Sequence, residues 1–150
     1  MLCKCECCQK INKEKIIKVG LVGGLIMFVL SMIMGQVTGI LFPSLMEEYA
    51  NAGLFRPWSD PLMSLYFLYP FVQGFVVAFV WEMFKKQCSE GTWTQKGICF
   101  GFTFWFLTGI TGMLISYSTF PVSFLMIVSW SLSSLVGLLG AGLVNAKMNK

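Results

Sequence analysis

The sequence predicts an all-α integral membrane protein. We expect a single four-transmembrane-helix bundle, built from two repeated helical hairpins, with both termini on the cytoplasmic side. The chain of 150 residues is 56% hydrophobic and 12% charged, about half the charged fraction of a soluble domain. Its charged residues divide the chain into apolar runs of membrane-spanning length. The lysines lie in every second connection between those runs, which gives the chain an orientation.

The first two apolar runs form one span each. No residue is ionisable from Val19 to Met46, and none is charged from Pro61 to Trp81. A membrane helix needs about 20 apolar residues to cross the hydrocarbon core, so we expect spans near 18–42 and 61–84. The first run is longer than the apolar core of a signal peptide and does not end in a small-residue cleavage pattern. We therefore expect it to be a retained helix.

The third apolar run is too long for one helix. It is uncharged from Gly97 to Ala146 and suits two spans joined by a tight turn. The stretch from Ser116 to Pro121 predicts that turn, because proline is accepted at a helix start and disrupts a helix interior. The remaining two spans are therefore expected near 97–117 and 122–145.

The basic residues predict the orientation of the helices. The 1–17 tail with the adjoining Lys18, the connection between the second and third spans, and the carboxyl terminus hold ten lysines, whereas the opposite side holds only Arg56. Such an excess in short segments marks the cytoplasmic side of a membrane protein. The sequence thus predicts a multi-pass protein of the cell membrane. Because topology accounts for the net charge of +4, we expect the lipid bilayer and no nucleic acid as a partner.

The two halves of the chain show an internal similarity. Aligning Lys18 with Lys96 superimposes glycine and phenylalanine positions of the first and third spans, and a second alignment places Gly74 on Gly137 in the second and fourth. Two hairpins in the same orientation form a parallel repeat, as in some transporters. Chance matching of glycine and phenylalanine in apolar sequence is the alternative.

Small residues recur at intervals of four and predict the faces along which the helices pack. Lipid tails provide no hydrophobic drive for helix association, so small residues allow the close contact that replaces it. A path for a substrate along one of these stripes is the alternative to packing. The expected packing positions are Gly20, Gly24, Gly35, Gly39, Gly74, Ala78, Gly97, Gly101, Ser133, Gly137 and Ala141.

Two polar residues of the second span are candidate contacts. Gln73 is its deepest amide and needs a partner on another helix, because an unpaired amide is costly in hydrocarbon; Ser129 or Ser133 would serve. Glu82 lies near the cytoplasmic surface, one turn before Lys85, and is expected to pair locally. No charge lies at mid-membrane, which disfavours an ion-coupled pump.

Four cysteines crowd the amino terminus at Cys3, Cys5, Cys7 and Cys8. On the cytoplasmic side their thiols remain reduced. They could hold a soft metal ion such as Zn²⁺ or Cu(I), although their spacing differs from that of a zinc ribbon. Lipid acylation and a tail without any specific ligand are the alternatives. The last of these is favoured, so no cofactor is expected.

The sequence also limits the class of function. It contains no histidine, the commonest general base and metal ligand, and no catalytic constellation, so we do not expect an enzyme. The leading hypothesis is a membrane protein that acts by association, as a homo-oligomer or an accessory subunit of a membrane partner. The alternative is a small transporter or channel for a neutral or lipid-like solute, built from the two hairpins.

Overall fold

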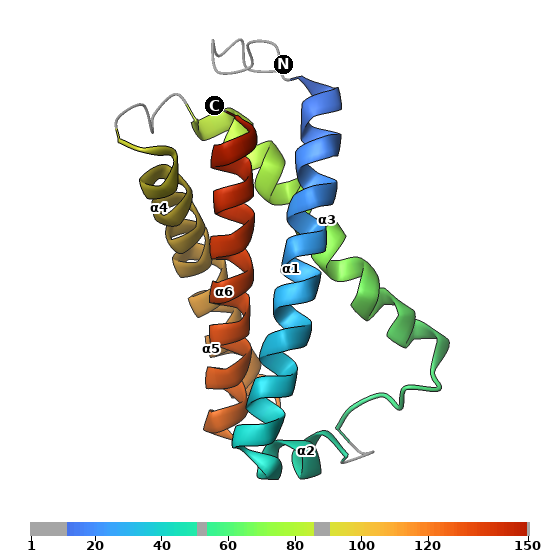
Figure 1. The fold of residues 1–150 in the computed structure, drawn as a ribbon. Coiled ribbons are helices and arrows are strands. Elements are labelled where there is room, and N and C mark those ends of the chain that lie inside the picture. Colours follow the sequence, from blue (N-terminus) through green and yellow to red (C-terminus); the bar gives the residue numbers. More distant parts are fainter. Residues whose placement is uncertain (1–11, 51–53, 86–90, 150) are drawn as a thin grey trace, which may run out of the picture.

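The computed structural model describes residues 12–50, 54–85 and 91–149, and these ranges are helical with no strand (Figure 1). Four helical segments are long and apolar enough to cross a membrane: Lys13–Leu41, Pro61–Phe84, Trp93–Thr119 and Phe124–Met148. The elements in chain order are α1 (Lys13–Leu41), α2 (Pro43–Tyr49), the 3₁₀ turn η2 (Pro61–Met63), α3 (Ser64–Phe84), α4 (Trp93–Trp105), the π-helical turn η3 (Phe106–Ile110), α5 (Thr111–Thr119) and α6 (Phe124–Met148).

Capping residues determine where the helices begin. The Asn12 side chain accepts a hydrogen bond from the backbone N–H of Lys15, so α1 starts five residues before the expected position. Thr92 and Gln95 form a reciprocal capping box at the start of α4, and Ser123 caps α6. Such side chains satisfy N–H groups that have no partner within the helix. The expected starts followed the charged residues and missed these caps.

The expected turn between the last two spans lies later in the chain than predicted. Helix α5 continues through Ser116 to Thr119, and the connection to α6 comprises residues 120–123, with Pro121 inside it. On the same end of the bundle, the connection between α1 and α3 contains the short helix α2. Asp60 begins η2, and the Leu62 N–H and the Arg56 guanidinium hold the pKa of its carboxyl below the usual range.

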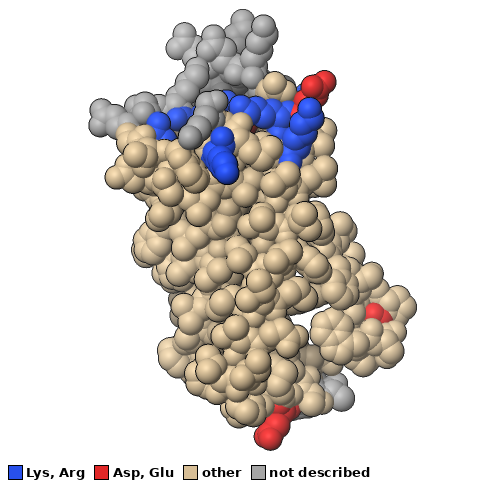
Figure 2. Space-filling view, in the orientation of Figure 1, with Lys and Arg blue, Asp and Glu red and all other residues tan. Residues whose placement is uncertain are grey.

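The four long segments pack in the order α3, α1, α6, α4. The start of α1 and the end of α6 lie at one end of the bundle, here called the terminal end; α2 lies at the other, the loop end (Figure 1). The lysines gather at the terminal end (Figure 2). One core cluster, which includes Trp81, Phe100 and Leu138, lies toward the terminal end, and a second, around Leu45 and Met126, toward the loop end.

The crossing of α1 and α3 depends on three glycines. A Cβ atom added to Gly74 would lie 2.5 Å from the carbonyl oxygen of Gly20 and 2.6 Å from the backbone nitrogen of Gly24. Real Cβ atoms do not approach backbone atoms so closely. The two helices therefore touch backbone to backbone, which is the mode of association that small residues permit in lipid.

The crossing of α4 and α6 has the same construction. Here Gly142 faces the carbonyl oxygen of Gly97 and the backbone nitrogen of Gly101. In the first crossing, Gly74 faces the equivalent two atoms of α1, the carbonyl oxygen of Gly20 and the backbone nitrogen of Gly24. A Cβ on Gly101 would lie 2.6 Å from the Leu138 carbonyl oxygen, and one on Gly24 would lie 3.1 Å from that of Pro70. By these contacts Gly97 corresponds to Gly20, Gly101 to Gly24, and Gly142 to Gly74.

This correspondence differs in register from the two sequence alignments. Those alignments place Gly23, not Gly24, on Gly101, and Gly137, not Gly142, on Gly74. Those alignments match residue types along the whole length of each span. The crossings depend instead on the few positions where backbones meet, and these are shifted by one residue on the first helix of the hairpin and by five on the second.

Candidate functional site: a cavity between the hairpins

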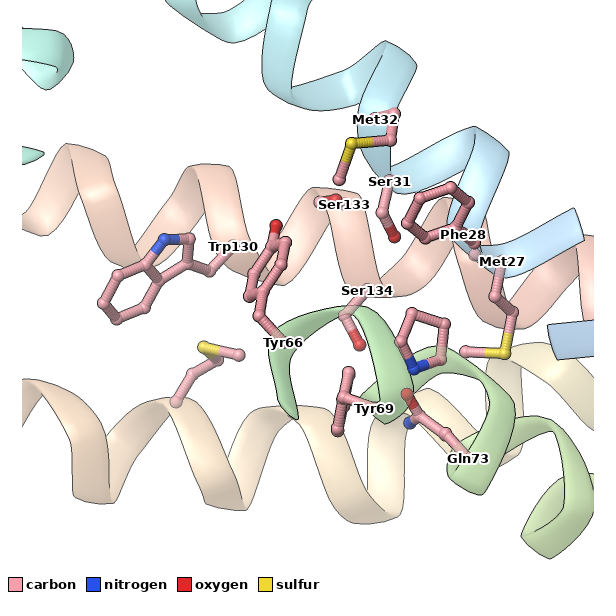
Figure 3. A pocket seen from close by; sticks show the side chains of 13 residues that line it. Met27, Phe28, Ser31, Met32, Tyr66, Tyr69, Gln73, Trp130, Ser133 and Ser134 are labelled. Carbon is pink, nitrogen blue, oxygen red and sulfur yellow. The ribbon is translucent and has the colours of Figure 1, made fainter. Parts of the chain in front are cut away.

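A cavity of about 200 Å³ lies in the middle of the bundle, between the α1–α3 hairpin and the α4–α6 hairpin. Its walls come from α1, α3, α5 and α6. Figure 3 shows Ser31 of α1, Gln73 of α3 and Ser134 of α6 pointing into the same space from three helices. Each of these residues lies near the middle of its span, so the cavity is at mid-bundle depth.

The lining combines apolar surface with neutral polar groups. Apolar surface comes from Met27, Phe28, Met32, Pro70 and Met113, and neutral polar groups come from Ser31, Tyr66, Tyr69, Gln73, Ser133 and Ser134. Among the described residues that line the cavity there is no aspartate, glutamate, lysine or arginine. Such a lining offers hydrogen bonds without charge.

The serine hydroxyls of the cavity differ from other hydroxyls on the spans. Thr38 and Ser116, each 2.8 Å from a carbonyl oxygen one turn earlier, donate back to their own helices, as hydroxyls in apolar surroundings commonly do. Within the described ranges no hydrogen bond is formed by the side chains of Ser31, Ser133 or Ser134. Their hydroxyls can therefore serve a molecule in the cavity.

The amino-terminal part of α3 forms the outermost wall. All side chains from Ser64 to Tyr69, here called the α3 arm, are exposed, although Tyr66 (47% exposed) and Tyr69 (59%) also line the cavity. The arm diverges from the other helices toward the loop end (Figure 1), and the surface is hollowed beside it (Figure 2). Pro70, buried where α3 meets α1, separates the arm from the packed half of the helix.

Aromatic side chains pack together at the loop end of the cavity. Trp130 of α6 lines the cavity and donates a hydrogen bond from Nε1 to the hydroxyl of Tyr49 in α2. The neighbouring Glu48 carboxylate accepts a hydrogen bond of 2.6 Å from the backbone N–H of Ser123. Burial raises the pKa of the Tyr49 hydroxyl. Helix α2 is thus fastened to the start of α6 and covers this side.

Ten of the eleven expected packing residues fall into three groups, and the eleventh, Ser133, lines the cavity. Gly20, Gly24, Gly74, Gly97 and Gly101 lie in the two crossings. Ala78 and Ala141 are buried, and Gly137 makes ordinary contacts with Met27. Two glycines lie elsewhere: a Cβ on Gly35 would meet no described atom within 4 Å, and one on Gly39 would meet Met46 of α2 rather than another span.

The two candidate polar contacts lie far apart. Gln73 and Ser133 both line the cavity, Gln73 one turn from Tyr69 on α3. Ser129 is buried and is not among the lining residues. Glu82 lies at the terminal end, where its carboxylate is 2.6 Å from the Lys85 ammonium group, the local pair that the spacing predicts.

The cysteine cluster at positions 3, 5, 7 and 8 lies outside the described residues, so the structure adds nothing to the expectations for it. Within the described ranges, Cys99 on α4 is a free, exposed thiol. The same ranges contain no group of three or more His, Cys, Asp or Glu side chains arranged to hold a metal ion.

Sequence reasoning missed Gly142, Ser31 and the cavity itself. The interval of four from Gly137 led to Ala141, whereas the contact with α4 is made by the next residue. The run Gly140-Ala141-Gly142 was the available signal, since three small residues in succession allow close approach on more than one face. Ser31 is the only serine from Val19 to Pro43, which marks it as unusual but does not identify a neighbour.

No model of a known protein family matches the chain, and no curated protein or solved structure matches it either. The cavity is therefore interpreted from its own geometry.

Proposed function

We propose that the protein is a small membrane transporter or channel for a neutral or lipid-like solute, which it binds in the cavity between its hairpins. The observation that carries this proposal is the group of unpaired serine hydroxyls that face an uncharged cavity at mid-bundle depth. Unpaired polar groups in an apolar interior are costly. A solute that forms hydrogen bonds with them compensates for that cost.

The proposal includes the architecture that such proteins use. We take the two hairpins to be parallel repeats, oriented with both termini in the cytoplasm. The matching glycine crossings support the repeat, and the lysines at the terminal end support the orientation. In repeat-built transporters the substrate site lies near the middle of the membrane, at the interface of the repeats. The position of the cavity, at mid-bundle depth between the two hairpins, supports the proposal.

A flux assay tests this function. Protein reconstituted into liposomes should accelerate the entry of glycerol, a small neutral solute, measured by stopped-flow light scattering against empty liposomes. The same preparation should leave sodium permeability unchanged, because the cavity offers no charge to replace the hydration of an ion. Glycerol entry equal to that of empty liposomes would count against transport of small neutral solutes.

A matched pair of variants makes the assay specific to the cavity. Ser134→Leu fills part of the cavity with an apolar side chain and should abolish the protein-dependent flux. Ser118→Leu makes the same exchange at an exposed position of α5, where the hydroxyl only donates back to Ile115, and should leave the flux unchanged. Equal loss in both variants would show that the effect is not located in the cavity.

Association as a homo-oligomer or accessory subunit stays a prediction. The wide apolar surface of the spans is needed to face lipid and does not by itself identify a partner. Its test is purification in mild detergent, in which a partner of fixed stoichiometry, or a single oligomer mass for the chain alone, would favour association.

A further inference from the structure

We infer that the ligand of the cavity is a neutral amphiphile: its hydroxyl- or carbonyl-bearing head occupies the cavity, and its hydrocarbon tail passes the α3 arm into the bilayer. This inference rests on the proposed function and specifies the solute class of the same site. It follows from four properties of the cavity, namely its neutrality, its hydrogen-bonding groups, its size and the position of its outermost wall.

Neutrality excludes a charged head. A charged group at this depth leaves water and finds no opposite charge on any described residue of the lining. Moving an unpaired ion into an apolar interior is prohibitive. Phosphate, carboxylate and ammonium heads are therefore unsuitable, and an uncharged head is required.

The hydrogen-bonding groups determine what that head carries. A serine hydroxyl donates one hydrogen bond and accepts others, and the Gln73 amide also does both. Ser31 and Ser134 approach the space from α1 and α6, so a hydroxyl or carbonyl between them can bond to both hairpins. The Gln73 side chain also has a hydrogen bond with Tyr69, but a pure hydrocarbon would leave the serine hydroxyls unpaired, which costs free energy.

Size restricts how much of the ligand is enclosed. The volume of about 200 Å³ is only slightly larger than an engineered cavity of about 150 Å³ that binds benzene. A glycerol or phenol head fits in such a space, but an acyl or isoprenoid chain does not. The remainder of a lipid-like molecule must leave the cavity.

The outermost wall, the α3 arm, provides a route by which the hydrocarbon tail can leave the cavity. Tyr66 and Tyr69 line the cavity and are also exposed on the lipid-facing side of the molecule. Because the α3 arm diverges from the bundle there and the surface beside it is hollowed (Figure 2), a tail can lie between the arm and α1. The aromatic rings give the tail an apolar surface, and their hydroxyls remain near the head.

Photolabelling of the full-length protein in nanodiscs tests the inference. The probe is a monoacylglycerol analogue with a diazirine next to its head and an alkyne at the end of its chain. After irradiation and digestion, we expect label on the segments around Ser133–Gly137 and Tyr66–Gln73. Unlabelled monoacylglycerol should compete for this labelling, whereas the alkane of equal chain length should compete about tenfold less well, the difference expected for one lost hydrogen bond. The fatty acid, whose carboxylate would lose its hydration without an opposite charge, should not compete at the same concentration.

The cavity variants serve here as well. Ser134→Leu should lower site labelling by about tenfold, because it removes a hydroxyl and fills space, and Ser118→Leu should not change it. Circular dichroism of both variants verifies that they remain folded, and Ser134→Ala, which removes only the hydroxyl, replaces Ser134→Leu if the larger side chain prevents folding. Equal competition by alkane and monoacylglycerol, or equal labelling of the parent and the folded cavity variant, would overturn the inference.

The outcome of the labelling experiment can be distinguished from the outcome of the glycerol flux assay. Selective labelling without flux would support this ligand class while contradicting transport of small solutes. Glycerol flux together with labelling that does not distinguish the head groups would support transport and overturn the ligand class.

Discussion

At the scale of single residues, the glycines that matter are those at which two backbones meet. Gly74 faces the backbone of Gly20 and Gly24 at distances that leave no room for a methyl group. Gly35 lies on α1, as Gly20 and Gly24 do, but a Cβ there would meet no described atom within 4 Å. The sequence presents all four as members of small-residue patterns. Only the structure separates the glycines that hold the fold together from one that does not.

Substitution by alanine should reveal that difference. Gly74→Ala places a Cβ 2.5 Å from the Gly20 carbonyl oxygen, so the helices must move apart, at a cost of about 1–3 kcal/mol. We expect a lower melting temperature in detergent for Gly74→Ala and an unchanged one for Gly35→Ala, measured by the thermal loss of monodisperse protein. A Gly74→Ala protein as stable as its parent would show that α1 and α3 do not meet at this position.

A second residue-scale prediction concerns Asn145. This side chain is 0% exposed; its amide nitrogen donates to the Ala141 carbonyl, but its side-chain oxygen has no described partner. The corresponding position of the first hairpin is the equally buried Val77. Asn145→Val should therefore keep or raise thermal stability, since a buried unpaired acceptor costs about 1–3 kcal/mol.

The reciprocal change is the control. Val77→Asn introduces the same amide on α3 and should lower the melting temperature. If Asn145→Val is instead strongly destabilised while retaining its helical content, the Asn145 oxygen has a partner, such as an internal water, that contributes to stability.

At the scale of elements, the existence of the four long helices could be predicted and their details could not. Long uncharged runs and the proline near position 121 predict four spans, because membrane-spanning length and loss of helical hydrogen bonding are local properties of the chain. The starts at Lys13 and Trp93 depend on the Asn12 cap and on the Thr92–Gln95 capping box, which the charge pattern does not reveal. The hydropathy pattern also does not reveal the π-helical turn η3, which lies within an uninterrupted apolar run.

The candidate site was harder to predict than the helices. Gln73 and Ser133 could be named because polar residues within apolar runs attract notice. Their meeting with Ser31 and Tyr69 depends on how α3 crosses α1, which is set by Gly74 and the backbone it touches. A crossing brings together residues that are distant in sequence, so no local pattern encodes it.

The amino-terminal cysteine segment allows an element-scale prediction. Because the spacing of Cys3, Cys5, Cys7 and Cys8 matches no established site, we expect free thiols that react rapidly with a maleimide whether or not a chelator was present during purification. Cys99 remains in every variant as an internal standard for labelling.

Elemental analysis tests the contrary hypothesis, that the four thiols bind a metal ion. Roughly one Zn²⁺ or Cu(I) per chain, lost when all four cysteines are replaced by serine, would establish a soft-metal site. The helical core should melt unchanged in that variant, since the glycines that form the two crossings lie in α1, α3, α4 and α6.

At the scale of the whole molecule, the ten lysines against one arginine predict that both termini face the cytoplasm. A reporter that is active only in the cytoplasm should be active when fused after Lys150 and silent when inserted at Ala52. A silent fusion at Lys150 together with an active insertion at Ala52 would reverse the orientation and leave the fold unchanged.

The two hairpins should also associate when they are separate polypeptides. Residues 1–88 and 89–150, produced together, should co-purify in roughly equal amounts, because α1 and α6 pack along each other without need of the connection between α3 and α4. Gly140→Leu should weaken that co-purification, since even a Cβ there would lie 2.6 Å from a methyl group of Leu30. Gly112→Leu, at a position with nothing within 4 Å, is the matched control.

The correspondence of the two crossings has a consequence for how a bound molecule is oriented. In a dimer of identical hairpins, a cavity on the symmetry axis would have two identical walls, and a solute would bind equally well in either of two directions. In this single chain, the position that holds Tyr69 on one hairpin holds Gly137 on the other, and Tyr66 is matched by Ser134. The walls are therefore unequal: one is bulky and aromatic, the other small and hydroxylated. The ligand that we propose for the cavity therefore has one preferred direction between the two hairpins.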